Sequence, residues 1–387
     1  MDYEKLLTDT AKNLKPSGIR KFFDVAERIP DVIALGVGEP DFKTPWHIRQ
    51  AAVDALSKGQ TRYTSNAGLM PLREEIANYM KRRFSLEYDP SNEITVTVGG
   101  SEAIDNIIRS VVSFGDEVLI PEPSFVCYAP LTELAGGKPV ILPTYEKDGF
   151  KLMPETVKNA ITKKTKLLIM PYPNNPTGAL MEKEDYEKIA EALKDTDILE
   201  LADEIYIELN YSGKHPFSFA QTEGMRERTI VVNGFSKTYA MTGWRIGFAC
   251  GPKEIMKATL KIHQYGIMCA PTVSQYAAIE ALKNGDEDIE NMRQNYNMRR
   301  RFLLDAFESL SVPCFEPKGA FYVFPNISEF ADTSDAFCND FLEKAHVAVV
   351  PGSAFGASGE GFIRISYAYS LEHLKKAVER FEKYIKR

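Results

Sequence analysis

The 387-residue chain has few cysteines, few histidines, no excess of basic residues and no long apolar run. Its five cysteines are odd in number and widely scattered, so neither a disulfide framework nor metal-ligand spacing is predicted. We expect them to be reduced packing residues of a cytoplasmic protein. The five histidines show no ligand pairing either, and no metal site is expected.

The net charge of −7 argues against nucleic acid or an anionic membrane as a partner, because both require a basic surface. No run of about 18 apolar residues occurs, so no membrane-spanning helix is predicted. The polar and acidic start of the chain, residues 1–5, is not typical of a signal peptide.

The length, with 44% hydrophobic residues, suits two lobes rather than one simple core. Short apolar runs alternate with amphipathic stretches, which predicts an α/β lobe with a largely parallel sheet over about residues 46–286. The helix at 45–58 is expected to have Thr44 as its N-cap and Pro45 at its first position. The predicted strands are 94–98, 117–120, 166–170, 198–202, 229–232 and 246–250, and the other predicted helices are 71–83, 101–112 and 183–194.

The last hundred or so residues predict a smaller α+β lobe. They begin with a long charged helix over 286–310, continue through strand-like 320–324 and 363–367, and end on a helix from about Leu371. One predicted strand is unusual, because Glu200 stands within 198–202 where a buried strand should be apolar.

The most informative stretch is 234–247, which follows an apolar run and contains Ser236, Lys237 and Arg245. A lysine that is partly desolvated at a strand end loses proton affinity and becomes an amine nucleophile. An amine nucleophile suggests a carbonyl partner, and pyridoxal phosphate is the carbonyl cofactor that proteins hold as a Schiff base. The fork of donors on Arg245 and the hydroxyl of Ser236 suit its phosphate. The alternative is a surface lysine in a loop.

Stretch 234–247 resembles the lysine signature of the class I aminotransferases, which are fold-type I pyridoxal-phosphate enzymes: a small residue, Ser, Lys, then Gly-x-Arg-x-Gly. The resemblance covers nearly the whole chain and is closest to the prokaryotic aspartate and aromatic aminotransferases. N-acetyl-diaminopimelate aminotransferases are also similar, notably through residues 260–265. The resemblance implies an aspartate aminotransferase-like fold, with a mostly parallel, seven-stranded mixed sheet between helices. Residues 46–286 would form the large cofactor-binding domain, and residues 1–45 and 287–387 the small domain.

Several candidate site residues lie beyond the carboxyl ends of strands, where open α/β sheets bind ligands. Gly100, Ser101 and Glu102 follow a strand and open a helix, which suits a phosphate. The alternative there is an ordinary capping box opened by Ser101. Asp203 closes a strand, where a carboxylate is costly without a partner. Its natural partner is the protonated pyridine nitrogen, which keeps the ring cationic and able to absorb electrons.

Arg364 interrupts an alternating apolar strand, and a buried arginine requires an anion. A structural ion pair is one possibility. The resemblance implies another, in which Arg364 grips the substrate α-carboxylate and Gly38 lets that carboxylate approach the backbone. Tyr63 resembles the tyrosine that reaches the phosphate in the neighbouring subunit, so a homodimer is expected. A plain turn at Gly38 and a core position for Tyr63 are the alternatives.

The resemblance also implies roles around the cofactor ring. Asn175, within the Asn-Pro-Thr-Gly motif, would donate to the phenolate oxygen, and Tyr206 would bond to the same oxygen. Phe125 would stack on the pyridine ring, and both Phe125 and Asn175 would contact substrate. A plain turn around Asn175 and a core position for Phe125 are the alternatives. Catalytic roles are predicted for Lys237, Asp203 and Tyr206.

The expected activity is the pyridoxal-phosphate-dependent transfer of an α-amino group from an amino acid to a 2-oxo acid such as 2-oxoglutarate. Some aspartate-specific members carry a lysine where this chain has Ser101, so an aromatic or broad donor range is expected. His263, Gln264 and Tyr265 are candidates to answer a second carboxylate, with core helix positions as the alternative. An aspartate or N-acetyl-diaminopimelate aminotransferase remains the alternative.

Two rivals belong to other classes. A pyridoxal-phosphate carbon–sulfur β-lyase would share Lys237, Asp203 and Arg364. An aminotransferase-like sensor domain of a transcription regulator would need a preceding DNA-binding module. Only about 30 residues stand before Gly36, and the acidic balance also disfavours this rival.

Overall fold

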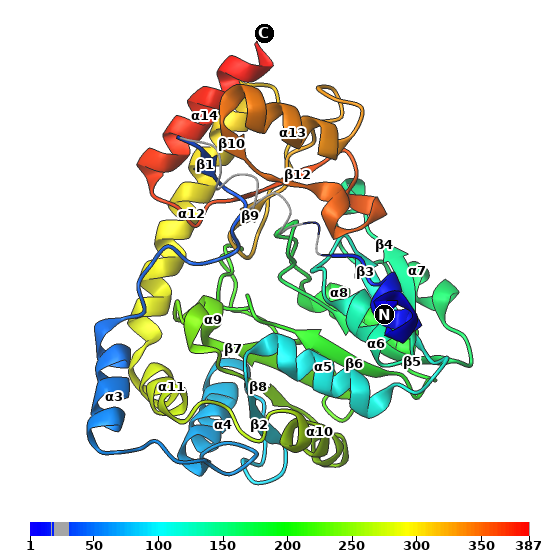
Figure 1. Ribbon diagram of the computed structural model, residues 1–387, viewed down its shortest axis with the longest axis vertical. Coiled ribbons are helices and arrows are strands. Elements are labelled where there is room, and N and C mark those ends of the chain that lie inside the picture. Colours follow the sequence, from blue (N-terminus) through cyan, green and yellow to red (C-terminus); the bar gives the residue numbers. More distant parts are fainter. Residues whose placement is uncertain (17, 19–30, 387) are drawn as a thin grey trace.

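The computed structural model describes residues 1–16, 18 and 31–386. A seven-stranded mixed sheet with the order β2-β8-β7-β6-β5-β3-β4 forms the centre of the larger part (Figure 1). β8 runs antiparallel to both of its neighbours, and the other neighbouring pairs are parallel. The predicted α/β fold with a mostly parallel sheet is therefore confirmed. The strands are β2 (Ile94–Thr97), β3 (Glu117–Glu122), β4 (Lys138–Pro143), β5 (Thr165–Met170), β6 (Leu199–Asp203), β7 (Thr229–Gly234) and β8 (Gly247–Cys250).

Helices cover both faces of this sheet because successive strand residues point to opposite sides. Leu167 and Ile169 of β5 pack in one apolar cluster with α5 and α10, while Leu168 and Met170 pack in another with α4, α8 and α11. The helices around the sheet are α3 (Trp46–Ser57), α4 (Met70–Phe84), α5 (Gly100–Val111), α6 (Tyr128–Leu134), α7 (Pro154–Ala160), α8 (Lys183–Leu193), α10 (Lys253–Gly266) and α11 (Thr272–Asn284).

The predicted helix beginning at Pro45 is present as α3, but the predicted cap is wrong. Pro45 occupies the N-cap position, and no side chain caps the helix. The Thr44 hydroxyl instead donates to the Ala240 carbonyl oxygen at 2.6 Å and accepts from Trp244 Nε1 at 3.0 Å. Thr44 thus ties the start of α3 to the segment that follows Lys237.

The long helix α12 (Asp286–Ser309) leads from the sheet to a second group of elements. β11 (Val350–Pro351), β12 (Ile363–Ser366) and β9 (Tyr322–Val323) form a three-stranded sheet in that order, beside α13 (Ser334–Ala345) and α14 (Leu371–Ile385). β1 (Ile33–Ala34) pairs in parallel with β10 (Val347–Ala348). The pairing joins an early and a late segment of the chain, and the division into residues 46–286 and residues 1–45 with 287–387 stays a prediction.

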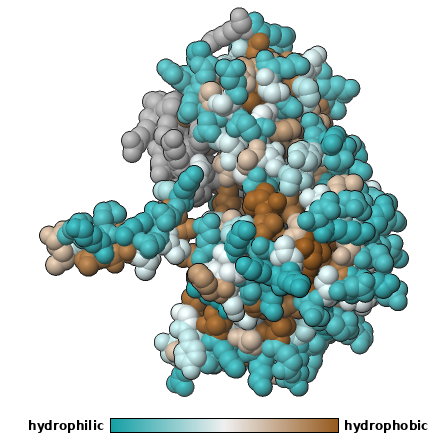
Figure 2. Space-filling model, turned by 90° about the vertical axis from the view of Figure 1, so that its right-hand side faces the viewer, coloured by the Kyte–Doolittle hydropathy of each residue, from teal (hydrophilic) through white to brown (hydrophobic). Residues whose placement is uncertain are grey.

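The N-terminal segment projects from the body of the molecule (Figure 2). It contains the short elements η1 (Tyr3–Leu6) and α1 (Asp9–Asn13), none of whose residues is buried. All five cysteines are free thiols. Over the described ranges, no helix combines the length and the apolar character that a membrane crossing requires.

Two glutamates close in sequence to the strand-end Asp203, Glu200 and Glu204, are fully buried. The unusual Glu200 lies within β6, and its Oε1 has no partner among the described residues, so burial raises its pKa well above the ordinary value. Glu204 accepts from the Ser218 hydroxyl at 2.7 Å and from the Phe219 N–H at 3.1 Å. Burial nevertheless raises the pKa of Glu204 to about 8. The Glu204 carboxyl is therefore held mainly in the neutral form at neutral pH.

Glu204→Gln tests this assignment through stability. The folded protein keeps the Glu204 proton up to about pH 8, whereas the unfolded chain releases it near pH 4.3. The free energy of unfolding of the parent protein should therefore fall as the pH rises through this window, whereas a glutamine stays neutral. From about pH 5 to pH 9, the variant should gain about 4 kcal/mol relative to the parent in denaturant titrations. The exposed Glu223→Gln should show no such trend, and a pH-independent difference for Glu204→Gln would contradict the assignment.

Candidate active site

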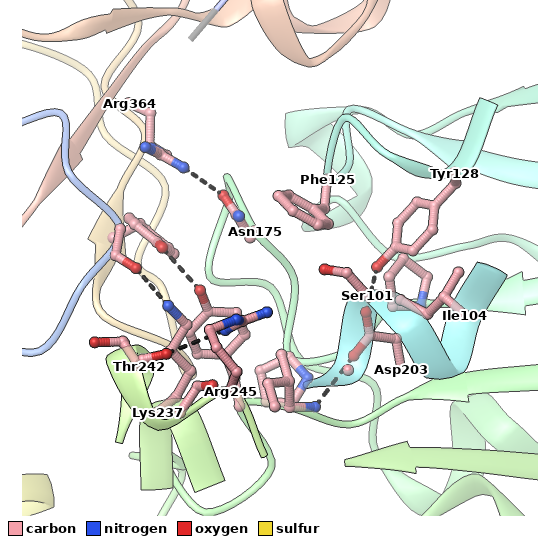
Figure 3. Close-up of a pocket in the computed structure, with 18 residues that line it drawn as sticks. Ser101, Ile104, Phe125, Tyr128, Asn175, Asp203, Lys237, Thr242, Arg245 and Arg364 are labelled. Carbon is pink, nitrogen blue, oxygen red and sulfur yellow. Dashed lines mark hydrogen bonds between the residues drawn. The ribbon is translucent and has the colours of Figure 1, made fainter. Parts of the chain in front are cut away.

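A cavity of about 330 Å³ lies beyond the carboxyl ends of β5, β6 and β7, and it faces β9 and β12. Figure 3 shows side chains from both parts of the molecule pointing into it. The structure brings most of the predicted site residues together here. Those that line the cavity are Gly38, Gly100, Ser101, Phe125, Asn175, Asp203, Tyr206, Ser236, Lys237, Arg245 and Arg364.

Lys237 lies on the single helical turn α9 (Phe235–Thr238), directly after β7. Its Nζ donates to the Gly38 carbonyl oxygen at 2.5 Å. Burial lowers the pKa of Lys237 to about 8; the nearby carboxylate of Glu39 opposes this shift, and the Arg364 and Arg245 charges add to it. About a tenth of the amine is therefore uncharged at pH 7, far more than for an ordinary lysine, and the uncharged form is the nucleophile. The alternative of an ordinary surface lysine is wrong.

Asp203 closes β6 and is 6% exposed. Its Oδ2 accepts from the Tyr128 hydroxyl at 2.7 Å, and its Oδ1 accepts a longer bond of 3.3 Å from the Ile205 N–H. Burial raises the pKa of Asp203, and these two bonds oppose the rise. A buried carboxylate at a cavity wall with no cationic partner among the described side chains suits a protonated ring nitrogen. Tyr128 was not predicted, because a tyrosine at the start of an amphipathic helix gives no functional signal.

The loop before α5 forms the anion-binding end of the cavity. Gly99 has a positive φ of 83° and is the N-cap residue of α5. A Cβ at Gly99 would lie 2.6 Å from Arg245 Nη2, so only glycine lets the guanidinium rest against this loop. The first N–H groups of α5 and Arg245 thus converge on a site suited to a phosphate. The alternative of a capping box opened by Ser101 is wrong, because no side chain caps this helix.

The predicted binding of the cofactor by Glu102 rests on its backbone N–H in the first turn of α5 and stays a prediction, while its side chain does not line the cavity. Its carboxylate accepts from the Val98 N–H at 2.5 Å and lies 2.6 Å from His263 Nδ1. The Glu102 carboxylate therefore holds the backbone of the loop before α5 from the side away from the cavity. His263 is fully buried against it, and neither Gln264 nor the 88% exposed Tyr265 lines the cavity. The expectation that these three residues answer a second carboxylate in this chain is not supported by their placement.

Arg364 lies at the other end of the cavity, on β12, and is 2% exposed. Its Nη1 donates to Asn175 Oδ1 at 2.8 Å, its Nη2 donates to the Gly36 carbonyl oxygen, and its Nε has no partner among the described residues. No carboxylate of the described residues forms a salt bridge with it, so the alternative of a structural ion pair is not found. Burial lowers the pKa of Arg364. A carboxylate ligand would offset the cost of burying this charge.

Tyr322 of β9 is a site residue that the sequence did not reveal. Its hydroxyl lies 2.8 Å from the hydroxyl of Tyr206, and its ring centroid lies 4.4 Å from the Arg364 guanidinium carbon. A Cβ at Gly38 would lie 2.4 Å from the Tyr322 hydroxyl, which supplies a reason for glycine at 38 besides the predicted approach of a carboxylate. Only the pairing of β9 with β12 brings this tyrosine to the site.

The two remaining predicted aromatic residues differ in their placement. Phe125 lines the cavity and meets Tyr128 edge to face, with ring centroids 6.0 Å apart. Tyr63 is 81% exposed and does not line the cavity of its own chain. Its predicted reach into a neighbouring subunit stays a prediction.

The residues present fit pyridoxal phosphate in charge and in size. A lysine with a lowered pKa suits its carbonyl, an uncompensated buried carboxylate suits its ring nitrogen, and a helix N-terminus with an arginine suits its phosphate. The cavity volume lies in the range of small-molecule sites. When bound, the cofactor supplies a cationic ring that withdraws electrons from the substrate α-carbon.

Comparisons with known proteins agree with this geometry. The family described as aminotransferase class I and II matches residues 30–381. A putative aminotransferase of Bacillus subtilis, YugH, is 50% identical over 98% of each chain, and an aspartate aminotransferase of Pyrococcus abyssi is 46% identical over 98% of each chain. The crystal structure of an aromatic aminotransferase from Pyrococcus horikoshii is 46% identical, with a TM-score of 0.90 over 94% of this chain and 98% of that one. This chain therefore belongs to the class I and II aminotransferase family and is a pyridoxal-phosphate-dependent aminotransferase.

Proposed function

We propose that this enzyme transfers the α-amino group of a broad range of amino acids, aromatic ones included, to a 2-oxo acid such as 2-oxoglutarate. One observation supports the broad range of amino donors. Among the described residues that line the cavity, the basic ones are Lys237, Arg245 and Arg364. The roles argued above commit each of them to the cofactor or to the α-carboxylate, and Ser101 offers only a hydroxyl. A second carboxylate on the donor thus lacks a dedicated cation from this part of the chain.

The names of the relatives support a range rather than one donor. The similar protein of Pyrococcus abyssi is named an aspartate aminotransferase, and the similar structure from Pyrococcus horikoshii is titled an aromatic aminotransferase. Apolar misfit among aromatic and aliphatic donors costs only about 1–3 kcal/mol, so it does not by itself restrict the enzyme to one of them.

The side chains then divide the chemistry among them. Lys237 would hold the cofactor, and its amine would move the proton of the substrate α-carbon as general base and then general acid. Holding the amine next to this carbon makes the transfer effectively intramolecular. Asp203 keeps the ring nitrogen protonated. Arg364 holds the α-carboxylate, and Asn175 and Tyr206 donate to the ring oxygen.

The proposed active unit is a two-fold homodimer. Arg245, at the phosphate end of the cavity, is exposed in the single chain, and the exposed Tyr63 has no place in its own site. In a two-fold dimer, each subunit would supply its Tyr63 to the site of the other, because an isologous interface uses the same surface on both subunits. The proposed location is the cytoplasm, which is supported by the five free thiols.

Asp203→Asn tests the role of the buried carboxylate. The neutral amide no longer favours a protonated ring nitrogen, so the variant should retain bound pyridoxal phosphate but lose transamination by about 10²-fold or more. Cofactor retention is read from absorbance after gel filtration, and turnover from formation of the 2-oxo acid. Glu204→Gln, at the next position but outside the cavity, is the matched control. Near-normal turnover of Asp203→Asn would contradict the role.

A donor panel with 2-oxoglutarate as the acceptor tests the proposed range. We expect phenylalanine or tyrosine to give a kcat/KM at least comparable to that of aspartate. Ser101→Lys should shift the ratio toward aspartate by supplying a cation, while Ser101→Ala serves as its control. A preference of the parent enzyme for aspartate or N-acetyl-diaminopimelate by more than about a hundredfold would refute the proposed range. Release of pyruvate from cystathionine without any acceptor would identify a β-lyase instead.

Sedimentation at the assay concentration tests the homodimer. We expect a dimer. Tyr63→Ala should weaken cofactor retention while the protein stays dimeric, because Tyr63 would contact the phosphate bound in the other subunit. The exposed Tyr3→Ala is the control for loss of a surface tyrosine. A fully active monomer would exclude the proposal.

A further inference from the structure

Tyr322 touches both halves of the active site. It lies on β9, whose neighbour β12 carries Arg364, and it is fully buried. Its hydroxyl meets Tyr206 from the other part of the molecule at 2.8 Å, while the face of its ring lies 4.4 Å from the Arg364 guanidinium. Neither contact is explained by the roles assigned so far.

We propose that Tyr322 is a positioning residue that joins these halves: its hydroxyl directs the proton of Tyr206 toward the cofactor, and its ring supports Arg364 for the substrate carboxylate. The proposal rests on the functions proposed above for Tyr206 and Arg364. It assigns a different task to each end of one side chain, so the two tasks can be separated by substitution.

The hydroxyl task follows from counting protons. Each tyrosine hydroxyl has one proton to donate and can accept through its oxygen. If Tyr206 donates its proton to the ring oxygen of the cofactor, its bond with Tyr322 can form only with Tyr322 as the donor. Accepting that bond fixes the Tyr206 hydroxyl and makes it a stronger donor, because hydrogen bonds in a chain polarise one another. Gly38 permits this arrangement by having no Cβ, which would lie 2.4 Å from the Tyr322 hydroxyl.

The ring task concerns a buried cation with few partners. Arg364 contacts two aromatic rings, since its guanidinium carbon is 4.4 Å from the Tyr322 ring centroid and 4.8 Å from that of Phe355. Asn175 and the Gly36 carbonyl hold the two terminal nitrogens. Cation–π contacts on the faces stabilise the charge and fix the plane of the fork before the carboxylate arrives.

Tyr322→Phe removes the hydroxyl and keeps the ring. The readout is the pH midpoint of the absorbance of the cofactor bound to Lys237, recorded without substrate. A weaker bond from Tyr206 stabilises the ring oxyanion less, so the midpoint should rise by about 0.5–1 pH unit. In a Tyr206→Phe background the same change should add nothing, because the hydroxyl acts through Tyr206. The control is Tyr367→Phe, which removes a buried hydroxyl that donates to the Ala320 carbonyl at 3.1 Å outside the cavity.

Tyr322→Leu removes the ring as well. Its midpoint should match that of Tyr322→Phe, whereas its KM for the amino acid should be about 3- to 30-fold higher than that of Tyr322→Phe. An unchanged midpoint in Tyr322→Phe, a shift that adds to that of Tyr206→Phe, or equal KM values for the two variants would overturn the proposal. If Tyr322→Leu does not fold, the comparison of Tyr322→Phe in the parent and in the Tyr206→Phe background still tests the role of the hydroxyl. A parent enzyme in which no cofactor attaches to Lys237 would contradict the proposed function itself, independently of Tyr322.

Discussion

Burial of the Lys237 amine is the physical constraint on which the site depends. Desolvation lowers the pKa of this amine to about 8, and the neighbouring charges of Arg364 and Arg245 act in the same direction. The Gly38 carbonyl gives the buried amine a hydrogen-bond partner, which keeps it oriented into the cavity. Water would restore the ordinary basicity of a lysine, so the walls that exclude water are part of the catalytic machinery.

The charges of the cavity are distributed to match this reactive centre. The parallel strands β5, β6 and β7 place Asn175, Asp203 and Lys237 beyond their carboxyl ends, and β12 places Arg364 opposite these residues. The arginines at the two ends suit two different anions, whereas the buried carboxylate suits a cationic ring between them. A ligand with a phosphate, a basic nitrogen and a carbonyl satisfies all of these groups at once, which no single contact would establish.

The sequence predicted those features that local patterns encode. Apolar periodicity predicted β5 and β7, and motif spacing predicted Lys237 and Asp203 as site residues. β4 was missed because its short apolar run, residues 140–142, lies between Pro139 and Pro143, and proline is disfavoured inside strands. Tyr322 was missed because its position depends on the register between β9 and β12, which no local pattern contains. The contacts of the Glu102 side chain with Val98 and His263 were not predicted, because a helix N-terminus predicts an anion site but not the direction of each side chain.

The most direct test of this account is the site of covalent attachment. Borohydride reduction of the enzyme with bound pyridoxal phosphate, followed by peptide mapping, should place the label on the peptide that contains Lys237. A Lys237→Arg variant, which keeps the charge but has no nucleophilic amine, should take up no label. A label on any other lysine of the parent enzyme would contradict the central claim that burial in this cavity selects Lys237.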